Sequence, residues 1–422
     1  MSQRILIIGA GFAGLHSALA ARRLITMATE QGAAKGTGDI EIAMIAPQPR
    51  LAILPRLYEE DPNSKVAPLG DILATVGVRF IQGMVDEIDT AKQEVRYSGG
   101  ETTNSGSHSI TYNRLVLAAG GSVSRPAGVL GLEHAFTVDG VEKAAQLESH
   151  FKQLALREPS KTRGTVVVCG GGFTGIEVAA ELPKRLGNIL GSDASSSSSS
   201  PNIRVVVVER ADVIAPDMAP GMRPFISESL QGLGVEVRLG AAVVGIEKDS
   251  GSGDATVRLS SGDRIEAATV VWTAGTVASP LAAQIPGDKE ARSGRVRVDE
   301  HLRAPSAPTC FVAGDVALAV ADAADGGGGG GHHARIQPVY VTCLDLGAAG
   351  SLAGVGWDTV VTSAGHAAKP LKRYINETLI YPAHDLASLL AAGDPANTNA
   401  SAIGALGSYF RLPGEGGIAS CA

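Results

Sequence analysis

Two glycine-rich segments constrain this chain more than any other feature, because each has the spacing of a dinucleotide-binding fingerprint. They occupy residues 9–14 and 170–175, and each follows a short apolar run. In such a segment the first glycine permits a tight turn, the second lets a pyrophosphate approach the backbone, and the third lets a helix pack closely on a strand. The fingerprint glycines are Gly9, Gly11 and Gly14 in the first segment and Gly170, Gly172 and Gly175 in the second. The pair predicts a protein that holds two dinucleotides at once.

Composition bounds the class of protein. The chain has 422 residues, of which 44% are hydrophobic and 19% charged, so we expect a globular protein of two or three domains. The formal net charge of −7 argues against nucleic acid as the main partner. The cysteines are scattered without a CxxC pair, which favours a reducing, cytoplasmic location and predicts no metal site; they are Cys169, Cys310, Cys343 and Cys421.

The ends of the chain and its apolar runs bear on targeting. The first expected strand begins at residue 4, which leaves no room for a signal peptide. No apolar run reaches the roughly 18 residues that a membrane-spanning helix needs. We therefore expect membrane association to be peripheral at most, and a homodimer is compatible with these features.

Apolar runs between turn signals predict an α/β fold with two nested, Rossmann-like, doubly wound units and a C-terminal segment. Expected strands are 4–8, 40–46, 114–119, 165–169, 203–209, 270–274 and 310–313, with antiparallel pairs at 78–88 with 94–98 and at 255–259 with 264–266. Expected helices are 13–29, 174–186, 222–233 and 336–352. A serine run at 195–200 and a glycine run at 326–331 are expected to be surface loops.

Five landmarks in order resemble the two-dinucleotide-binding-domain flavoproteins, the glutathione-reductase-like superfamily. They are the two fingerprints and the segments 115–120, 271–275 and 309–315. Within that superfamily, residues 55–58 and 172–182 are most similar to type II NADH dehydrogenases. The resemblance implies a discontinuous FAD-binding domain at 1–125 and 276–350, an NAD(P)H-binding domain at 126–275, and a C-terminal segment at 351–422.

The resemblance also implies which residues hold FAD. Asp315 is expected to accept a hydrogen bond from a ribityl hydroxyl, although an aspartate there also suits a helix cap. The second strand ends without the acidic residue that usually binds the adenosine ribose, so Gln48 or Arg50 is expected to substitute. The full expected set is Gly9, Gly11, Phe12, Ala13, Gly14, Gln48, Arg50, Pro55, Arg56, Val85, Ala119, Gly120, Gly314, Asp315, Leu346 and Gly347.

The second unit carries the acid that the first lacks. Glu209 ends the strand after the second fingerprint, where a carboxylate accepts from both ribose hydroxyls and repels a 2′-phosphate. We therefore expect NADH rather than NADPH, although the adjacent Arg210 could accommodate a phosphate and Glu209 could instead be a surface residue. The expected nicotinamide-nucleotide set is Gly170, Gly172, Thr174, Gly175, Glu209, Ala274 and Gly275.

Two residues are candidates for catalysis. The resemblance places Glu177 close to the nicotinamide and flavin, where burial would raise its pKa; alternatively it pairs with Lys184 or Arg185 on the helix surface. Cys343 lies in a segment that packs under the flavin in relatives, so it is a candidate thiol, whereas Cys169 and Cys310 are expected in the core. The chain lacks the paired cysteines of disulfide reductases.

The electron acceptor is the open question. Respiratory type II dehydrogenases carry a glutamine-rich quinone-contact motif near residue 340, where this chain has Gln337, Tyr340, Thr342 and Asp345. The small positive cluster at residues 369–373 is more typical of a solvated face than of a membrane anchor. We expect hydride transfer from NADH to FAD and then electron transfer to a quinone or another small acceptor. The alternatives are a flavin-dependent oxidase or tailoring enzyme acting on a small organic substrate, and an NADH-sensing flavoprotein.

Overall fold

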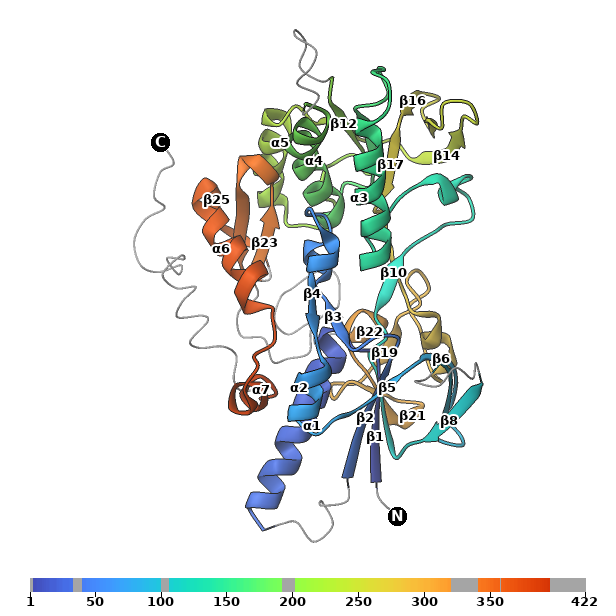
Figure 1. Ribbon diagram of the computed structural model, residues 1–422, viewed down its shortest axis with the longest axis vertical. Helices are drawn as coiled ribbons and strands as arrows, with labels where there is room; N and C mark the ends of the chain where they lie inside the picture. The colour runs from blue at the N-terminus through green and yellow to red at the C-terminus, as the bar shows by residue number, and fades with distance from the viewer. Residues whose placement is uncertain are drawn as a thin grey trace.

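A six-stranded sheet forms the lower half of the molecule in Figure 1 and draws its strands from distant parts of the sequence. The computed structural model describes residues 3–32, 40–99, 106–191, 202–319, 341–356 and 358–394. Five strands of this sheet run parallel, and β20 adds an antiparallel edge. The order is β20 (Arg303–Ala304), β21 (Ala307–Val312), β9 (Arg114–Leu117), β1 (Gln3–Ile8), β2 (Ile40–Ala46) and β5 (Arg79–Gln82).

Both faces of this sheet are covered, as the apolar strands require. Helices α1 (Phe12–Glu30) and α2 (Gly70–Thr75) pack on one face, and an antiparallel meander packs on the other. The meander consists of β6 (Met84–Asp89), β7 (Glu94–Ser98) and β8 (Ser107–Thr111). Successive residues of β1 show the division, because Leu6 and Ile8 belong to the meander side and Ile7 to the helix side.

A second, four-stranded parallel sheet repeats this plan in the upper half of Figure 1. Its order is β13 (Glu236–Arg238), β12 (Arg204–Val208), β11 (Thr165–Cys169) and β17 (Thr269–Trp272). One face packs against α3 (Val141–Ala155), α4 (Phe173–Gly191) and α5 (Arg223–Gly232). The other packs against β14 (Val243–Lys248), β15 (Ala255–Leu259) and β16 (Arg264–Ala267). The expected α/β fold class is confirmed.

The two halves are joined by an antiparallel ribbon of β10 (Gly121–Val123) and β18 (Thr276–Ala278). The chain leaves the first sheet through β10, completes the second sheet, and returns through β18. The second unit is therefore inserted within the first, and both crossings are hydrogen-bonded to each other. Short pairs complete the first half: β3 (Arg50–Ala52) with β4 (Val66–Pro68), and β19 (Val296–Val298) with β22 (Ala317–Ala319).

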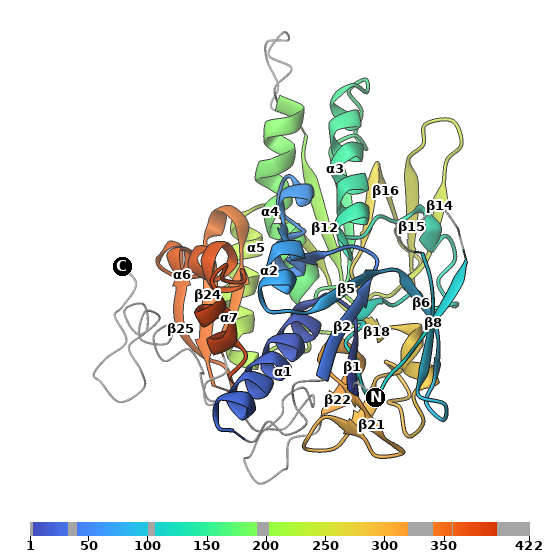
Figure 2. The ribbon, with the colours of Figure 1, turned by 60° about the horizontal axis from the view of Figure 1, so that its bottom comes forward.

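Residues 341–394, called the C-terminal segment from here on, begin with a third sheet that packs against α4 and lies beside the two halves in Figures 1 and 2. It comprises β23 (Val341–Asp345), β24 (Ser351–Val355) and β25 (Val360–Gly365), followed by α6 (Lys369–Tyr374), a π-helical turn (Ile375–Leu379) and α7 (Leu386–Ala392). Helix α7 packs on α1, and an ion pair between Arg23 and Asp394 fixes this contact. The expected domain boundary at residue 350 falls inside this third sheet, between β23 and β24.

The expected helix at 336–352 is wrong over its described part. Residues 341–352 form a strand, a turn and the start of a second strand. The reversal takes place at Gly347 and Gly350, whose positive φ angles of 57° and 107° do not fit a right-handed α-helix. Val341 and Thr342 are β-branched and favour a strand. Residues 336–340, with Gln337 and Tyr340, lie outside the described residues, as do the serine and glycine runs.

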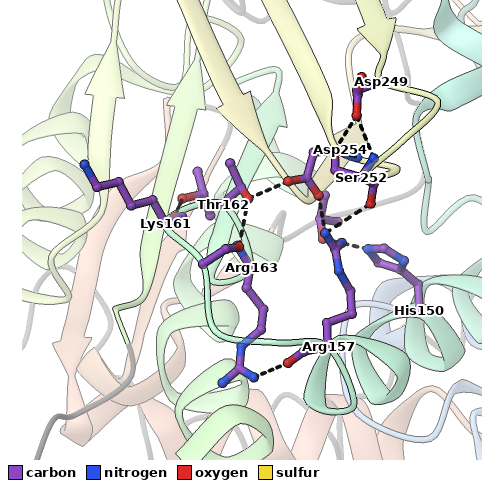
Figure 3. A network of polar contacts seen from close by, with 11 residues as sticks. His150, Arg157, Lys161, Thr162, Arg163, Asp249, Ser252 and Asp254 are labelled. Carbon is purple, nitrogen blue, oxygen red and sulfur yellow. Dashed lines mark hydrogen bonds and ion pairs between the residues drawn. The ribbon is translucent and has the colours of Figure 1, made fainter.

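A polar network on the second half ties a hairpin turn to the end of α3 (Figure 3). Asp254 accepts hydrogen bonds from the Arg157 guanidinium at 2.5 Å and from the Thr162 hydroxyl. Asp249 accepts from the backbone amide of Ser252 at 2.6 Å and so closes the turn between β14 and β15. These contacts hold strands β14–β16 on the second sheet, on the face opposite helices α3, α4 and α5.

One buried arginine connects three elements. Arg185 of α4 forms an ion pair with Glu148 of α3, and their side chains are 4% and 13% exposed. Its guanidinium also donates to the backbone carbonyl of Tyr58 at 2.9 Å and lies 5.2 Å from the centre of the Phe151 ring. Arg185 thereby fastens the 55–58 segment of the first half to the helices of the second.

We expect Arg185→Ala to lower the free energy of unfolding by about 3–5 kcal/mol, because it leaves the largely buried Glu148 carboxylate with only the exposed Lys152 as a cation. The matched control is Arg204→Ala, which breaks the Arg204–Glu236 pair, whose side chains are 36% and 39% exposed. That pair should contribute only about 0–1 kcal/mol. Urea unfolding of both variants checks the contrast, and equal losses would contradict it.

Candidate functional site

The first fingerprint closes a tight turn between β1 and α1. Gly9 has a φ angle of 108°, and a Cβ atom there would lie 2.3 Å from the carbonyl oxygen of Ala118. A Cβ atom on Gly14 would lie 2.0 Å from the carbonyl oxygen of Gly9, so the first turn of α1 touches the end of its own strand. Only glycine fits at either position.

Space is open where a pyrophosphate would approach. A Cβ atom built on Gly11 would meet nothing within 4 Å. Helix α1 begins directly after Gly11, with no side-chain cap and no acidic residue in its first turn. Its first amide groups and the positive end of its dipole therefore suit an anion. The residues present fit the pyrophosphate of FAD.

The second fingerprint repeats this geometry at the start of α4. Gly170 has a φ angle of 115°, and a Cβ atom on Gly175 would lie 1.9 Å from the carbonyl oxygen of Gly170. Gly172 again has open space around it, and the first turn of α4 contains no acidic residue. Thr174 is exposed in that turn. The chain thus has two matching anion cradles, one in each half.

Other expected FAD-side residues lie around the first cradle. Ala119 and Gly120 follow β9, and Gly120 has a φ angle of 66° with open space around it. Gly314 brings the end of β21 to the first turn of α1, since a Cβ atom there would lie 2.9 Å from that of Ala13. Asp315 is exposed inside the short 3₁₀ turn Gly314–Val316, so it is not an N-cap. Its predicted contact with the ribityl chain stays a prediction.

The residues expected to replace the missing ribose acid lie after β2. Gln48 is exposed, whereas the Arg50 guanidinium forms an ion pair with Glu142 of α3. Arg50 therefore links the two halves of the molecule. Val85 is buried in β6 and pairs with Tyr97.

The segment 55–58 is anchored to the C-terminal part of the chain. Pro55 and Arg56 lie in the 3₁₀ turn Leu54–Arg56. The Arg56 guanidinium donates to the Glu59 carboxylate at 2.7 Å and to the Tyr381 hydroxyl at 3.2 Å. This segment is thus held by the region just beyond the π-helical turn.

Glu209 is a structural part of the second cradle, and its interpretation as a surface residue is wrong. Its side chain accepts from the backbone amides of Gly171 at 2.7 Å and of Ala211 at 2.9 Å, and the residue is 7% exposed. These bonds hold the carboxylate at the end of β12, directly against the fingerprint loop. Ala274 and Gly275 follow β17 on the other side of Gly170.

Glu177 is buried in α4 and does not pair with Lys184 or Arg185, so that alternative is wrong. Its Oε1 atom accepts from the Lys372 ammonium at 2.8 Å and from the backbone amide of Asp345 at 3.0 Å. Glu177 is 3% exposed. Burial raises the pKa of Glu177 to about 7, and the positive charge of Lys372 opposes that rise. The carboxyl group can therefore hold or release a proton near neutral pH.

A second ion pair lies beside the first. The Lys369 ammonium donates to Oδ1 of Asp345 at 2.6 Å, and the same oxygen accepts from the amide of Gly347 at 2.8 Å. Lys372 also donates to the backbone carbonyl of Cys343 at 3.0 Å. The expectation that the 369–373 cluster is a solvated face is wrong for Lys372, whose side chain is only 5% exposed, whereas Arg373 is exposed.

The turn after β23 packs directly on α4. A Cβ atom on Gly347 would lie 2.1 Å from the carbonyl oxygen of Ala180, and the Leu346 side chain is buried in the core of the second half. This close approach brings the backbone of β23 within reach of Glu177. The predicted contact of Leu346 and Gly347 with FAD stays a prediction.

Burial disfavours the thiolate form of the three described cysteines. Cys169 and Cys310 are buried in strands, as expected, and Cys421 lies outside the described residues. Cys343 is half-buried, and burial raises the pKa of its thiol to about 12. The thiol is therefore protonated near neutral pH, which argues against a nucleophilic role.

Three functional candidates escaped the sequence. Lys372 and Asp345 reach Glu177 from a segment far along the chain, and no local pattern joins them. Glu181 follows Glu177 by one helical turn, so the i, i+4 spacing of two glutamates was the available signal. Within the described ranges, no cluster of three or more His, Cys, Asp or Glu side chains could hold a metal ion. Of the described helices, none is long and apolar enough to cross a membrane.

Replacing Gly14 and Gly11 separately distinguishes the packing and binding roles of the first cradle. We expect Gly14→Ala to be recovered in low yield and without bound FAD, because its Cβ would overlap backbone. Gly11→Ala should fold, with an unfolding midpoint near that of the wild-type protein. It should bind FAD at least about tenfold more weakly, a loss of about 1.4 kcal/mol in binding free energy. Circular dichroism and FAD titration of the apoprotein measure both effects, and a normally folded Gly14→Ala would contradict the first.

Removing Lys372 should destabilise the protein in a pH-dependent way. In Lys372→Ala, Glu177 loses its cation, so its pKa should rise further and its ionised form should become more costly. Loss of stability relative to wild type should therefore be several kcal/mol at about pH 8 and smaller at about pH 5.5, where the carboxyl is protonated in both proteins. Urea unfolding at both pH values measures this, with Arg373→Ala as the exposed control. A pH-independent loss would contradict the pairing.

Comparison with known proteins agrees with this geometry. Residues 3–341 match the family model described as pyridine nucleotide-disulphide oxidoreductase. An NADH dehydrogenase-like protein of Mycobacterium tuberculosis is 38% identical over 417 residues, covering 93% of this chain and 98% of the relative. The type II NADH:quinone oxidoreductase Ndh of the same organism is 29% identical over 334 residues, covering 74% of this chain and 67% of the relative.

Solved structures show the same fold. The sulfide:quinone oxidoreductase of Aquifex aeolicus covers 100% of both chains with a TM-score of 0.67 at 15% identity. The NDH2 of Plasmodium falciparum in complex with NADH gives a TM-score of 0.59 at 16% identity, covering 75% of this chain and 65% of that one. The chain therefore belongs to the pyridine nucleotide-disulphide oxidoreductase family, as a flavoprotein oxidoreductase of its NADH dehydrogenase-like group.

Proposed function

We propose that this protein is an FAD-dependent oxidoreductase that takes a hydride from NADH and passes electrons to a quinone or another small acceptor. The observation that carries the proposal is the pair of matching anion cradles, with Glu177 buried just behind the second. Two cradles allow two dinucleotides to be held together. Glu177 supplies an acid–base group close to the start of α4, where the nicotinamide nucleotide would bind.

The first cradle would hold FAD through the backbone of residues 11–14 and the open space at Gly120. Bound FAD would supply the hydride-accepting and electron-donating chemistry. The protein's own contribution is to position the reactants and to exclude water. Gly14 and Gly314 bring backbone close to that cradle and leave little freedom for the bound group to shift.

The second cradle favours NADH. The Glu209 carboxylate is fixed by two backbone amides, so it cannot easily move away from a 2′-phosphate. A fixed negative charge repels that phosphate and accepts hydrogen bonds from ribose hydroxyls. Arg210, by contrast, is exposed.

Glu177 would hold a proton near the reacting groups. Its Oε1 atom is fixed by Lys372 and by the Asp345 amide, so the carboxyl group is oriented before any substrate arrives. An acceptor such as a quinone takes up protons as well as electrons. A carboxyl group whose pKa lies near 7 can donate one and be recharged under ordinary conditions.

The acceptor is the less determined half of the reaction. A quinone is supported by the 29% identical relative, whose name includes quinone oxidoreductase. The 38% identical relative is named only NADH dehydrogenase-like. Asp345 lies in the segment where quinone-reducing relatives carry glutamines, and its ion pair with Lys369 of α6 makes this part of the site more polar. If the acceptor is a membrane quinone, the protein works as a peripheral enzyme at the membrane surface.

Anaerobic titration with NADH and NADPH tests the donor. We expect NADH to bleach the flavin absorbance rapidly and NADPH to do so with at least about tenfold lower affinity. Glu209→Gln keeps an acceptor for the backbone amides but removes the negative charge. It should therefore reduce the difference in affinity between NADH and NADPH. Arg210→Gln is the matched control on the adjacent exposed residue and should leave the difference unchanged.

The same protein preparation separates the alternatives. Turnover with a soluble quinone would support the proposed acceptor class. Equal bleaching of the wild-type protein by NADPH would contradict the donor preference. An absence of bleaching by either nucleotide would contradict the proposed function and favour an oxidase or a sensor.

A further inference from the structure

A second glutamate of α4 lies beside Glu177 and has no partner in the mechanism above. Glu181 is one helical turn further along and shares the same face of the helix. It is partly exposed, whereas Glu177 is 3% exposed. No residue in the described part of the chain forms a hydrogen bond or an ion pair with the Glu181 carboxylate.

The surroundings of Glu181 are mostly acidic. Asp345 of β23, Lys369 of α6, and Glu59 and Glu60 from the segment after residue 56 all act on it electrostatically. Burial raises the pKa of Glu181 to about 7, the negative charge of Asp345 acts in the same direction, and Lys369 opposes it. Glu181 can therefore change its protonation state near neutral pH, at a place that solvent reaches.

Asp345 connects the two glutamates. Its backbone amide donates to Glu177 at 3.0 Å, and its carboxylate lies in the electrostatic neighbourhood of Glu181. The Tyr58 hydroxyl is buried, lies near Asp345 and Glu177, and makes no well-formed hydrogen bond. A buried hydroxyl with so weak a partner is costly, and its place among acidic groups suits a path for proton exchange.

Glu177 needs such a neighbour, because it has no path of its own to solvent. Its partner Lys372 has a side chain that is 5% exposed, so the pair is closed on that side. Lys369, which is paired with Asp345, is 24% exposed. Asp345, whose amide contacts Glu177, also pairs with Lys369 and acts electrostatically on Glu181, so polar groups extend from Glu177 toward solvent on this side.

We propose that Glu181 is the proton-exchange residue of the site, which recharges Glu177 from solvent past Asp345 and the Tyr58 hydroxyl. The proposal rests on the proposed function, since an acceptor that takes up protons must draw them from somewhere. When Glu177 gives its proton to the acceptor oxygen, an O–H bond breaks on Glu177 and one forms on the acceptor. A proton from solvent then enters at Glu181 and moves to Glu177. No electrons move in this step, and one solvent proton is consumed for each proton donated.

Glu181 acts through Glu177, so it is a positioning and relay residue. Its variant is therefore tested by flavin bleaching, by reoxidation and by rescue with a weak acid. We expect Glu181→Gln to leave bleaching by NADH unchanged and to slow reoxidation by a soluble quinone at least about tenfold above about pH 7. A small diffusible weak acid such as imidazolium should restore part of that rate. The matched control is Glu228→Gln on the exposed side of α5, which should behave as wild type.

Two measurements do not depend on turnover. The infrared carbonyl stretch of protonated carboxylic acids in the resting protein should titrate near pH 7, and Glu181→Gln should lose one of the titrating groups. Because the pKa is raised on folding, the proton on Glu181 favours the folded state below its usual pKa, and this advantage is lost as the pH rises through about 7. Glu181→Gln should therefore have a higher unfolding midpoint than wild type at about pH 8 and a smaller difference at about pH 5.

The outcomes are separable from those of the proposed function. If NADH does not bleach the wild-type flavin, the proposed function fails, while the infrared titration still tests whether Glu181 exchanges protons. If Glu181→Gln slows bleaching and reoxidation equally, or leaves both the pH profile and the infrared titration unchanged, the relay is wrong. Glu181→Asp keeps a carboxylic acid at this position. It should therefore show the titrating infrared signal, and its reoxidation by quinone should not need an added weak acid. If Glu181→Gln does not fold, Glu181→Ala with weak-acid rescue replaces it, and failure of rescue would overturn the proposal.

Discussion

The structure depends on a contact between backbone and backbone that a methyl group would prevent. In both halves the first turn of a helix touches the carbonyl oxygen that ends its own strand, at Gly14 against Gly9 and at Gly175 against Gly170. At the start of each helix the space beside Gly11 or Gly172 is open. The parallel sheets, their apolar strands and the inserted topology repeat that arrangement twice, once in each half.

The chemistry of the site comes from ionic groups taken out of water. Glu177 and Lys372 are each less than a tenth exposed, and the Asp345–Lys369 pair lies beside them. Removing such charges from water is costly, so their persistence calls for a compensating role. The buried pair also joins α4 to α6, so the same interaction that sets the proton affinity of Glu177 fastens the C-terminal segment to the second half.

Local patterns predicted the parts of this fold that local physics determines. The strands β1, β2 and β11 and the starts of α1 and α4 agree with expectation, because apolar runs and glycine spacing act within a few residues. In the site, the sequence predicted the fingerprint glycines and singled out Glu177 and Glu209, but not the charged groups that contact Glu177. Lys372 was assigned to a solvated face because its sequence neighbours are charged, and only the packing of the third sheet buries it. The apolar content of residues 336–352 predicts a helix, but the glycine turns at 347 and 350 reverse the chain and allow two strands instead.

The family match covers both dinucleotide cradles but ends before the charged residues that contact Glu177. The shared model ends at residue 341, where β23 begins, so the dinucleotide cradles lie inside it while Asp345, Lys369 and Lys372 lie beyond it. Lys372 of α6 supplies the counter-charge to Glu177 of α4, a helix that belongs to the matched part. Such an attached module can be exchanged or altered during evolution while cofactor binding is kept. Divergence of electron acceptors among proteins that share one nucleotide-binding framework then needs change in one short stretch of chain.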